Sequence, residues 1–410
     1  MEIVIRTAGP DDYEAAVETV NAAFLEHSDA RSAAVIIREI WDADRTWLAW
    51  DGDRVAGTFR SWATELTVPG GAQLSSAAVA GVTVLPTHRR RGIMSAMAAR
   101  EHAAIRERGE AAGLLYAAEY PIYGRLGYSP GTWMVEWTVD SRSARMLGER
   151  TGTVSLTAPS AETRDVCRAV FERWQAVQPG EIRRNDASWD FSFGIRQRPW
   201  EDTPWRGFVV LHHDPTGSVD GYARYTADGK WEHGIAAGMV QVEDLHALTQ
   251  AAEDDLVRFL LEIDLVTTVK LGMRRIAEPF LWRLHNQRAA RLTAHNDGMW
   301  VRLFDVPRAL ETRSYERSAG LVIEVVDDPA LAGTARLALD AGPDGATCTR
   351  TSRSPDLTLP VAALGGAYLG GTRLVDLART FGADEHRPGA LAKADALLRT
   401  ADPPWCSTFF

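Results

Sequence analysis

Cysteine is scarce in this sequence, and its scarcity excludes two kinds of structure. Only Cys167, Cys348 and Cys406 occur among 410 residues, and no two of them form a CxxC pair. Neither a disulfide framework nor a zinc site is therefore expected, and we predict no metal. Such a chain suits a reducing compartment.

Long apolar runs are also missing. No segment approaches the ~20 apolar residues that a membrane-spanning helix needs. The first residues, MEIVIRTAGPDDYEAA, carry acids where a secretory signal would need a basic start and an apolar core. We therefore expect a cytoplasmic protein with no membrane partner.

Positive charge is in deficit over the chain as a whole. The sequence holds 45 Lys and Arg against 55 Asp and Glu, which gives a formal net charge of -10. Because affinity for nucleic acid rests on neutralising phosphates, this balance argues against a nucleic-acid partner and favours a cationic one. The patterns GxxxxGK, followed by Ser or Thr, and GxGxxG are absent as well.

Hydrophobic periodicity divides the chain into three regions of mixed α and β structure, in line with a length that predicts two or three domains. The first region ends in a strand, a basic glycine turn, a helix and a strand, which together form one βαβ-like unit over residues 78–118. Its predicted elements are a strand at 2–6, helices at 10–24 and 32–41, hairpins at 46–60 and 65–74, a strand at 77–86, a helix at 93–106 and a strand at 112–119.

The second region repeats this style without an arginine-glycine turn. We predict a helix over 160–178, strands at 207–214 and 219–227, and a long helix over 245–261. A degenerate copy of the first domain is the interpretation we favour. From residue 301 onward strands dominate, the last of them LTLPVAALGGAYLGG, and two short helices follow. We expect a third, α+β domain there.

The basic turn THRRRGIM, residues 87–94, lies between a predicted strand and a predicted helix. A helix start presents unpaired N–H groups and the positive end of the helix dipole, which together favour an anion. Gly92 allows close approach of the backbone, and Arg89, Arg90 and Arg91 add charge. A diphosphate fits best, and a solvated helix start or a nucleic-acid patch is the alternative.

The stretch VTVLPTHRRRGIMSAMAAREH resembles the acetyl-CoA motif of the GNAT superfamily of N-acetyltransferases, Arg/Gln-x-x-Gly-x-Gly/Ala. Arg89 and Gly92 match its first two fixed places, and Met94 departs at the third. Downstream, IYGRLGY and DGMWVRLFDVPRALETRSYE resemble the enhanced intracellular survival (Eis) family, and LTLPVAALGGAYLGGTRLVDLA resembles sterol carrier proteins.

This resemblance covers essentially the whole chain and implies an α+β architecture of three domains. The expected order is a catalytic GNAT domain at 1–150, a degenerate GNAT-like domain at 151–300 and a sterol-carrier-protein-like domain at 301–410. The implied enzyme is an acetyl-CoA-dependent N-acetyltransferase. The residues implied to bind acetyl-CoA are Val82, Thr83, Val84, Arg90, Arg91, Gly92, Ile93, Met94, Ser95, Ala118 and Glu119.

The resemblance also implies two catalytic groups. Tyr123 matches the general acid that protonates the departing CoA sulfur, with Tyr120 and Tyr128 as competing candidates. The terminal carboxylate of Phe410 matches the proton acceptor. The ending DPPWCSTFF supports it independently, since two aromatic residues are unusual in a free, solvated tail. A covalent route through Cys406 is disfavoured because no histidine lies near it in the sequence.

The implied acceptor is a small-molecule amine, aminoglycoside-like, or a lysine side chain, and Glu26, Trp41 and Trp47 are candidates to line its pocket. The family further implies a homo-oligomer, specifically a hexamer. A rival interpretation is a lipid-binding or polyketide-binding module that works through the carrier-like domain, with a non-catalytic GNAT domain.

Overall fold

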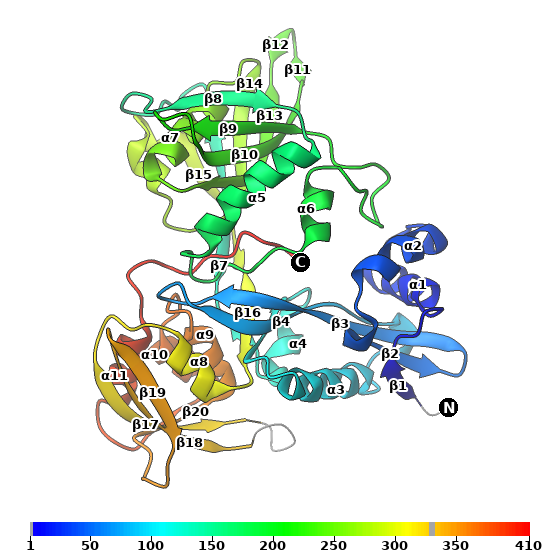
Figure 1. The fold of residues 1–410 in the computed structure, drawn as a ribbon, viewed down its shortest axis with the longest axis vertical. Coiled ribbons are helices and arrows are strands. Elements are labelled where there is room, and N and C mark those ends of the chain that lie inside the picture. The colour runs from blue at the N-terminus through cyan, green and yellow to red at the C-terminus, as the bar shows by residue number, and fades with distance from the viewer. Residues whose placement is uncertain (1–2, 328–332) are drawn as a thin grey trace.

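Three β-sheets flanked by helices organise the chain (Figure 1). The computed structural model describes residues 3–327 and 333–410. The first two sheets have seven strands each and the third has five, and the small hairpin of β11 (Trp231–Glu232) and β12 (Ile235–Ala236) stands apart. The predicted α+β fold class is confirmed.

The first sheet has the order β1-β2-β3-β4-β5-β16-β6, and only its β4–β5 pair is parallel. Its strands are β1 (Val4–Thr7), β2 (Thr46–Asp51), β3 (Arg54–Thr67), β4 (Gln73–Val84), β5 (Ala112–Tyr116), β6 (Ser129–Pro130) and β16 (Met299–Leu303). Its helices are α1 (Tyr13–Phe24), α2 (Ala30–Ile40), α3 (Ile93–Glu107) and α4 (Tyr120–Tyr123).

Alternating side chains of β2 assign these helices to opposite faces of the sheet. Leu48 packs in one cluster with α1 and α2, whereas its neighbour Ala49 packs with Ile93 and Met97 of α3. Successive strand residues point to opposite faces, so the sheet is covered on both sides. The crossover β4–α3–β5 confirms the predicted βαβ unit.

The second sheet repeats the plan in the order β15-β7-β14-β13-β10-β9-β8, with β13–β14 as its parallel pair. Its strands are β7 (Trp133–Asp140), β8 (Thr153–Thr157), β9 (Phe208–His213), β10 (Val219–Asp228), β13 (Gly238–Ala247), β14 (Val266–Arg274) and β15 (Ala290–Asp297). Its helices are α5 (Ala161–Gln175), α6 (Asp186–Ser192) and α7 (Gln250–Leu261).

The predicted helix over 245–261 begins five residues late. Leu245 pairs with Ala223 in the β13–β10 ladder, so its backbone belongs to a strand. Thr249 then caps α7 by accepting a hydrogen bond from the backbone N–H of Ala252. A hydroxyl cap of this kind fixes the helix start, and the strand absorbs the residues before it.

The third sheet has the order β19-β18-β17-β20-β21. Its strands are β17 (Ala319–Val326), β18 (Ala335–Gly342), β19 (Gly345–Arg350), β20 (Leu357–Pro360) and β21 (Asp384–Glu385). Its helices are α8 (Val306–Thr312), α9 (Val361–Ala367), α10 (Leu374–Phe381) and α11 (Ala390–Leu398).

The predicted strand LTLPVAALGGAYLGG is only partly a strand. It ends at Pro360, and the fully buried helix α9 follows up to Ala367. A Cβ at Gly365 would lie 2.7 Å from the carbonyl oxygen of Val301, so glycine is needed where α9 meets β16. Proline ends the ladder because it has no N–H to donate, and the apolar run conceals this change from strand to helix.

Strands cross between the sheets. β7 lies in the second sheet although its residues fall within the range 1–150 expected for the first domain, and β16, which follows the last strand of the second sheet in sequence, lies in the first sheet. β16 pairs with β5 from Met299–Tyr116 to Leu303–Ala112, and Val301 and Leu303 are completely buried. The sheets therefore do not follow the bounds expected at 150 and 300, which remain predictions.

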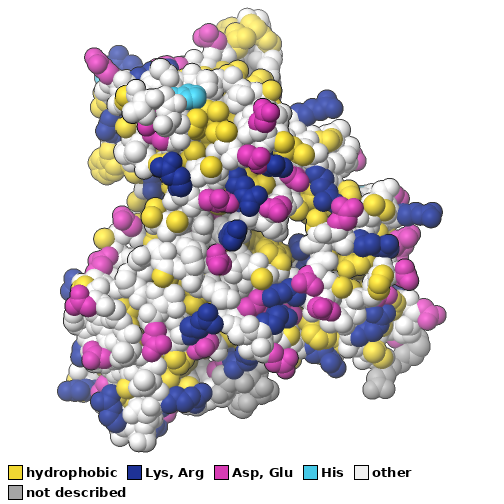
Figure 2. Space-filling view, viewed as in Figure 1, with side chains coloured by type: hydrophobic (Ala, Val, Ile, Leu, Met, Phe, Trp, Pro, Cys, Tyr) yellow, Lys and Arg dark blue, Asp and Glu magenta, His cyan; other side chains and the backbone are white. Residues whose placement is uncertain are grey.

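On the face shown in Figure 2, acidic and basic side chains are interspersed, so neither sign forms a continuous field there. Among the described residues, no helix is both long and apolar enough to cross a bilayer.

The strand exchange predicts that a fragment of residues 1–150 does not fold alone. Without β16, the outer edge of β5 and the apolar side chains beneath it lose their cover. We expect aggregates or an unfolded chain by size exclusion and circular dichroism, whereas the full chain unfolds cooperatively. A monomeric fragment with a cooperative transition would contradict this dependence.

Candidate active site

The parallel strands β4 and β5 separate within the first sheet. Their ladder joins Ser76–Ala78 to Ala112–Leu114 and stops there, although β4 continues to Val84. A cavity of about 790 Å³ is lined by the end of β4 and by the segment after β5. It contains the predicted residues Val82, Thr83, Val84, Ala118 and Glu119.

The start of α3 closes the same cavity. Gly92 caps the helix in the left-handed region at φ +78°, and no side chain caps its N–H groups. Arg90 also lies in that region, at φ +63°, which is uncommon for a residue with a side chain. Uncapped N–H groups and the helix dipole favour an anion here. The lining residues of this turn are His88, Arg89, Arg90, Gly92, Ile93, Met94 and Ser95.

Arg91 is the one predicted acetyl-CoA residue that does not line this cavity. Its guanidinium instead lies 3.5 Å from the carboxylate of Asp51, which also pairs with His88 at 3.2 Å. Arg89 lines the cavity, and its Nε donates to the carbonyl of Val84 at 3.4 Å. The sequence alone does not indicate which of the three arginines points away from the cavity.

A second cavity of about 590 Å³ shares Phe24, Val82, Ala118 and Tyr123 with the first. Its other walls come from distant segments of the chain. They include Glu26, Trp41, Arg60, Val79, Gly81, Tyr116, Trp200, Asp297, Phe409 and Phe410. The structure thus brings Tyr123 and Phe410, nearly three hundred residues apart in sequence, to one cavity.

Tyr123 differs in position from the two competing tyrosines. It is 6% exposed and lines both cavities. Tyr120 is 58% exposed, and Tyr128 is completely buried with its hydroxyl 3.3 Å from His102. Burial, with a smaller contribution from the charge of Glu119, raises the pKa of Tyr123 to about 12. The Tyr123 phenol is therefore protonated at neutral pH.

The C-terminal tail reaches the second cavity through aromatic contacts. The ring of Phe410 lies 5.2 Å from that of Trp62 and 5.2 Å from that of Tyr116, centroid to centroid. Phe409 contacts Tyr116 at 4.8 Å. Edge-to-face rings at these distances stabilise one another, and the tail end is held against the wall of the cavity.

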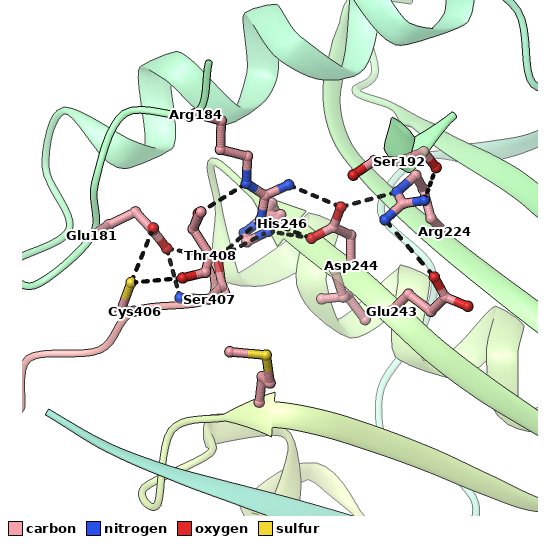
Figure 3. Close-up of polar contacts among 12 residues, drawn as sticks. Glu181, Arg184, Ser192, Arg224, Glu243, Asp244, His246, Cys406, Ser407 and Thr408 are labelled. Atoms are coloured by element: carbon pink, nitrogen blue, oxygen red, sulfur yellow. Dashed lines mark hydrogen bonds and ion pairs between the residues drawn. The ribbon is translucent and has the colours of Figure 1, made fainter. Parts of the chain in front are cut away.

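A buried polar network holds the segment before these rings (Figure 3). Arg184 donates to both carboxylate oxygens of Asp244 at 3.0 and 2.9 Å, and its Nε donates to the hydroxyl of Thr408 at 2.9 Å. Glu181 accepts from the backbone N–H and the hydroxyl of Ser407 at 2.7 and 2.6 Å. Two charged side chains of the second domain therefore bind the tail directly.

The two arginines of the network keep the carboxylate of Asp244 ionised. Burial alone would raise the pKa of Asp244, but Arg184 and Arg224 overcome burial and hold that pKa well below its usual range. The stabilisation is present above the unfolded pKa of about 4 and is lost as pH falls through the lower folded pKa. The ion pair of Arg184 and Asp244, which we call the tail dock, therefore stays charged at neutral pH.

Cys406 lies inside this network and lines neither of the two large cavities. Burial, followed by the charge of Glu181, raises the pKa of its thiol well above the usual value. Its sulfur contacts Glu181 Oε1 and the carbonyl of Thr408, each at 3.4 Å. A protonated, enclosed thiol is a poor nucleophile, so these contacts give Cys406 a packing role.

Two of the three candidate acceptor residues lie in the second cavity. Glu26 and Trp41 line it, and burial raises the pKa of Glu26. Trp47 packs in the cluster of α3, and its indole donates to Glu101 at 2.7 Å. No group of three potential metal ligands occurs among the residues that the structure describes.

Arg60, Tyr116, Glu181 and Arg184 belong to this site but were not found from the sequence. None lies in a motif, and each acquires its role through partners more than fifty residues away in sequence or through the wall of a cavity. For Arg60 one weak signal exists, a charge within the otherwise apolar and neutral strand segment VAGTFRSW.

Family models match the chain in three consecutive stretches. Acetyltransferase (GNAT) domains match residues 4–131 and 180–303, and a sterol carrier protein domain matches residues 306–407. Together with the separation of β4 from β5 and the uncapped start of α3, these matches identify a GNAT acetyltransferase. The GNAT fold implies the use of acetyl-CoA.

Individual relatives agree. An uncharacterized N-acetyltransferase from Streptomyces griseus is 40% identical over the whole of both chains. The N-acetyltransferase Eis of Mycobacterium tuberculosis is 34% identical, with 80% of this chain and 79% of that protein covered. The crystal structure of Eis1 from Mycobacterium abscessus has a TM-score of 0.86 at 32% identity, covering both chains fully. The chain belongs to the Eis family of N-acetyltransferases, which confirms the resemblance and the tandem fold predicted from the sequence.

The tail dock yields a prediction for Arg184→Met. Asp244 keeps Arg224 but loses its two-pronged partner, and Thr408 loses its donor. We expect a loss of about 3 kcal/mol in the free energy of unfolding by urea titration. Carboxypeptidase should also remove Phe410 faster.

The control is Arg168→Met, which breaks ion pairs to Glu172 and Asp186 on the surface. It should cost less than about 1 kcal/mol and leave the rate of digestion unchanged. Equal protection of Phe410 in Arg184→Met and the parent chain would show that Arg184 does not hold the tail.

Proposed function

We propose that this enzyme transfers the acetyl group of acetyl-CoA to a primary amine of a cationic acceptor, such as an aminoglycoside-like molecule or a lysine side chain. The transfer is direct, without an acetylated enzyme. The observation that supports it best is the meeting of the two cavities at Val82, Ala118 and Tyr123, with Phe410 on the acceptor side.

The proposed acetyl-CoA site occupies the first cavity. Uncapped N–H groups at Ile93, Met94 and Ser95, with Arg89 and Arg90, would hold the diphosphate. The backbone of Val82–Val84, left unpaired by β5, would bind the pantetheine arm and steady the oxyanion. Thr83 supports this strand from behind, since its hydroxyl lies 2.7 Å from that of Thr58. Met94 contributes its N–H, so its departure from the motif does not prevent binding.

The proposed proton transfers use two groups of the second cavity, which we call the acceptor cavity: the terminal carboxylate of Phe410 and the phenol of Tyr123. The terminal carboxylate of Phe410 accepts a proton from the ammonium of the acceptor, directly or through water, and the resulting neutral amine attacks the thioester carbonyl, so that the C–N bond forms as the C–S bond breaks. Tyr123 then donates its phenolic proton to the departing sulfur. The Tyr123 phenol is a weak acid, with a pKa of about 12. Desolvation in the same cavity would also raise the pKa of the CoA thiol, so the two pKa values would lie closer together than if the phenol alone were desolvated.

A cationic acceptor agrees with the carboxylates around the second cavity. Glu26 and Asp297 both line it, and the terminal carboxylate of Phe410 adds a third negative charge. Asp297 also accepts from the indole of Trp300 at 2.6 Å, which fixes its direction. We further propose a cytoplasmic homohexamer, as the family resemblance implies, which analytical ultracentrifugation would test.

The direct test of the function is thiol release from acetyl-CoA in the presence of a panel of amines that includes aminoglycosides and lysine peptides. We expect one equivalent of thiol for each acetylated amine. Absence of release with every amine would overturn the proposal and favour the lipid-binding interpretation.

Replacement of Tyr123 by phenylalanine removes the proposed acid without changing the ring. We expect kcat to fall about 100-fold while KM for acetyl-CoA stays within a factor of about two. Because the pKa of Tyr123 is about 12, ionisation of this group should not lower the parent rate between pH 7 and 10.

Tyr120→Phe is the matched control, since Tyr120 lies on the same short helix but is mostly exposed. It should keep nearly full activity. Parent-like turnover in Tyr123→Phe would exclude Tyr123 as the acid.

Deletion of Phe410 moves the terminal carboxylate to Phe409 and should reduce kcat at least about 100-fold. The cause is displacement of the proposed base by one residue. Phe410→Ala keeps a carboxylate at position 410 but loses the ring contacts to Trp62 and Tyr116, so it should be impaired less than the deletion. Full activity after deletion, or with a C-terminal tag, would refute the proposed base.

A further inference from the structure

Arg60 of β3 extends into the acceptor cavity without a polar partner. Its Nε is inaccessible to solvent and makes no hydrogen bond. No ion pair or hydrogen bond joins the guanidinium to any group within residues 3–327 and 333–410, and burial is the sole cause of the shift in its pKa, which falls to about 10. Arg60 is still charged at neutral pH, so a positive charge faces the cavity unneutralised.

The buried arginines of this chain are all hydrogen-bonded to carboxylates or backbone carbonyls. Arg184 binds Asp244, and Arg274 binds Glu253 and Glu278. Arg258 donates to the carbonyls of Met146, Leu147 and Gly148. Arg60 is only partly buried, and it differs from these arginines because its buried Nε has no hydrogen-bond partner.

Aromatic rings hold Arg60 in place while leaving its donors unused. Its guanidinium carbon lies 4.9 Å from the ring centre of Trp41 and 4.9 Å from that of Trp62. Gly81, at φ +58°, lies beneath the side chain, and a Cβ there would be 3.4 Å from Nε. Rings attract the cation through their faces but accept no hydrogen bonds in its plane, where a carboxylate or phosphate binds in two-pronged fashion.

Position ties Arg60 to the reaction. Gly81, which it covers, directly precedes Val82, and Val82 lines both cavities. Trp62, one of its two rings, contacts Phe410. An anionic group held by Arg60 would therefore belong to the acceptor, with the acceptor amine directed toward Tyr123 and Phe410.

We propose that Arg60 binds a carboxylate or phosphate of the acceptor, so that the acceptor is a small amine that also carries an anionic group. This inference rests on the proposed acetyl transfer and narrows its acceptor. Glu26 and Asp297 line the same cavity, and their carboxylates would bind an ammonium group of the acceptor. A free diamino acid such as lysine is the simplest molecule that satisfies both kinds of charge.

Matched substrates test the inference, because they differ only at the anionic group. Lysine is compared with lysinamide, and phosphoethanolamine with ethanolamine, in the thiol-release assay. The parent enzyme should prefer the anionic member of at least one pair by about tenfold or more in kcat/KM. The pair that shows the preference tells carboxylate from phosphate, and no preference in either pair would overturn the inference.

Arg60→Met should remove this preference mainly through KM, and Arg60→Lys should restore part of it, since lysine keeps the charge without the fork. The Tm of Arg60→Met should change little, because the partly buried guanidinium makes no hydrogen bond or ion pair with the described residues and methionine can still pack against Trp41 and Trp62. Arg6→Met is the control. Arg6 also lies over an indole, 4.7 Å from Trp50, but it pairs with Asp12 outside the cavity, and its loss should leave the preference intact.

Two other results would contradict the inference. An equal fall in kcat for charged and uncharged amines in Arg60→Met would mean that Arg60 serves the terminal carboxylate of Phe410. A lowered Tm with the preference retained would mean that it only supports Trp41 and Trp62.

Calorimetric titration of lysine and of phosphoethanolamine into the CoA-bound protein separates this inference from the proposed function. Binding that is lost in Arg60→Met, without any acetylation by the parent, would refute the transferase proposal and support the anion site. Acetylation of uncharged amines with no Arg60-dependent binding would support the transferase and refute the anion site.

Discussion

The buried pair of Arg184 and Asp244 is the interaction on which the proposed chemistry of this protein depends. It joins the second domain to the tail of the third, through Thr408 and Ser407, two residues before the chain ends in the first. A tail of twelve residues without helix or strand has little order of its own. The charged, buried anchor fixes Ser407 and Thr408, and the ring contacts of Phe409 and Phe410 then hold the tail end against the cavity wall.

The second domain shows how a repeated fold acquires a different use. In the first domain, the parallel strands part beyond Ala78 and leave a cavity of about 790 Å³. In the second, the parallel ladder ends at Val242 and Leu271, and Trp405 of the tail lies beside the gap, with its indole donating to the carbonyl of Met273 at 2.7 Å. Only about 10 Å³ remains there. The place that opens toward a ligand in one copy holds the chain's own tail in the other.

The parts of this site that were predictable from sequence are those whose residues lie close together in the chain. Residues 82–84 and 92–95 lie in one strand-turn-helix segment, which brings them together locally, and the family resemblance supplied their expected roles and that of Tyr123 on the next short helix. Arg184 and Arg60 gain their roles from partners that only the folded chain supplies. The same limit applies to the fold: β16 joins the first sheet through long-range pairing, and α9 continues an apolar strand without a change of composition.

The charge pattern of the second cavity differs from the net charge of the chain. The excess of ten acidic groups is spread over the chain, and on the visible face both signs are interspersed. Along the cavity wall, by contrast, Glu26 and Asp297 lie with a single arginine, Arg60, whose guanidinium is held over the rings of Trp41 and Trp62. Dissolved salt screens charges on an exposed surface over about 10 Å, whereas charges along the wall of a cavity are screened less. In the proposed function, selection among amines depends on how these groups and the Phe410 carboxylate are spaced, and the overall acidity contributes mainly to the encounter.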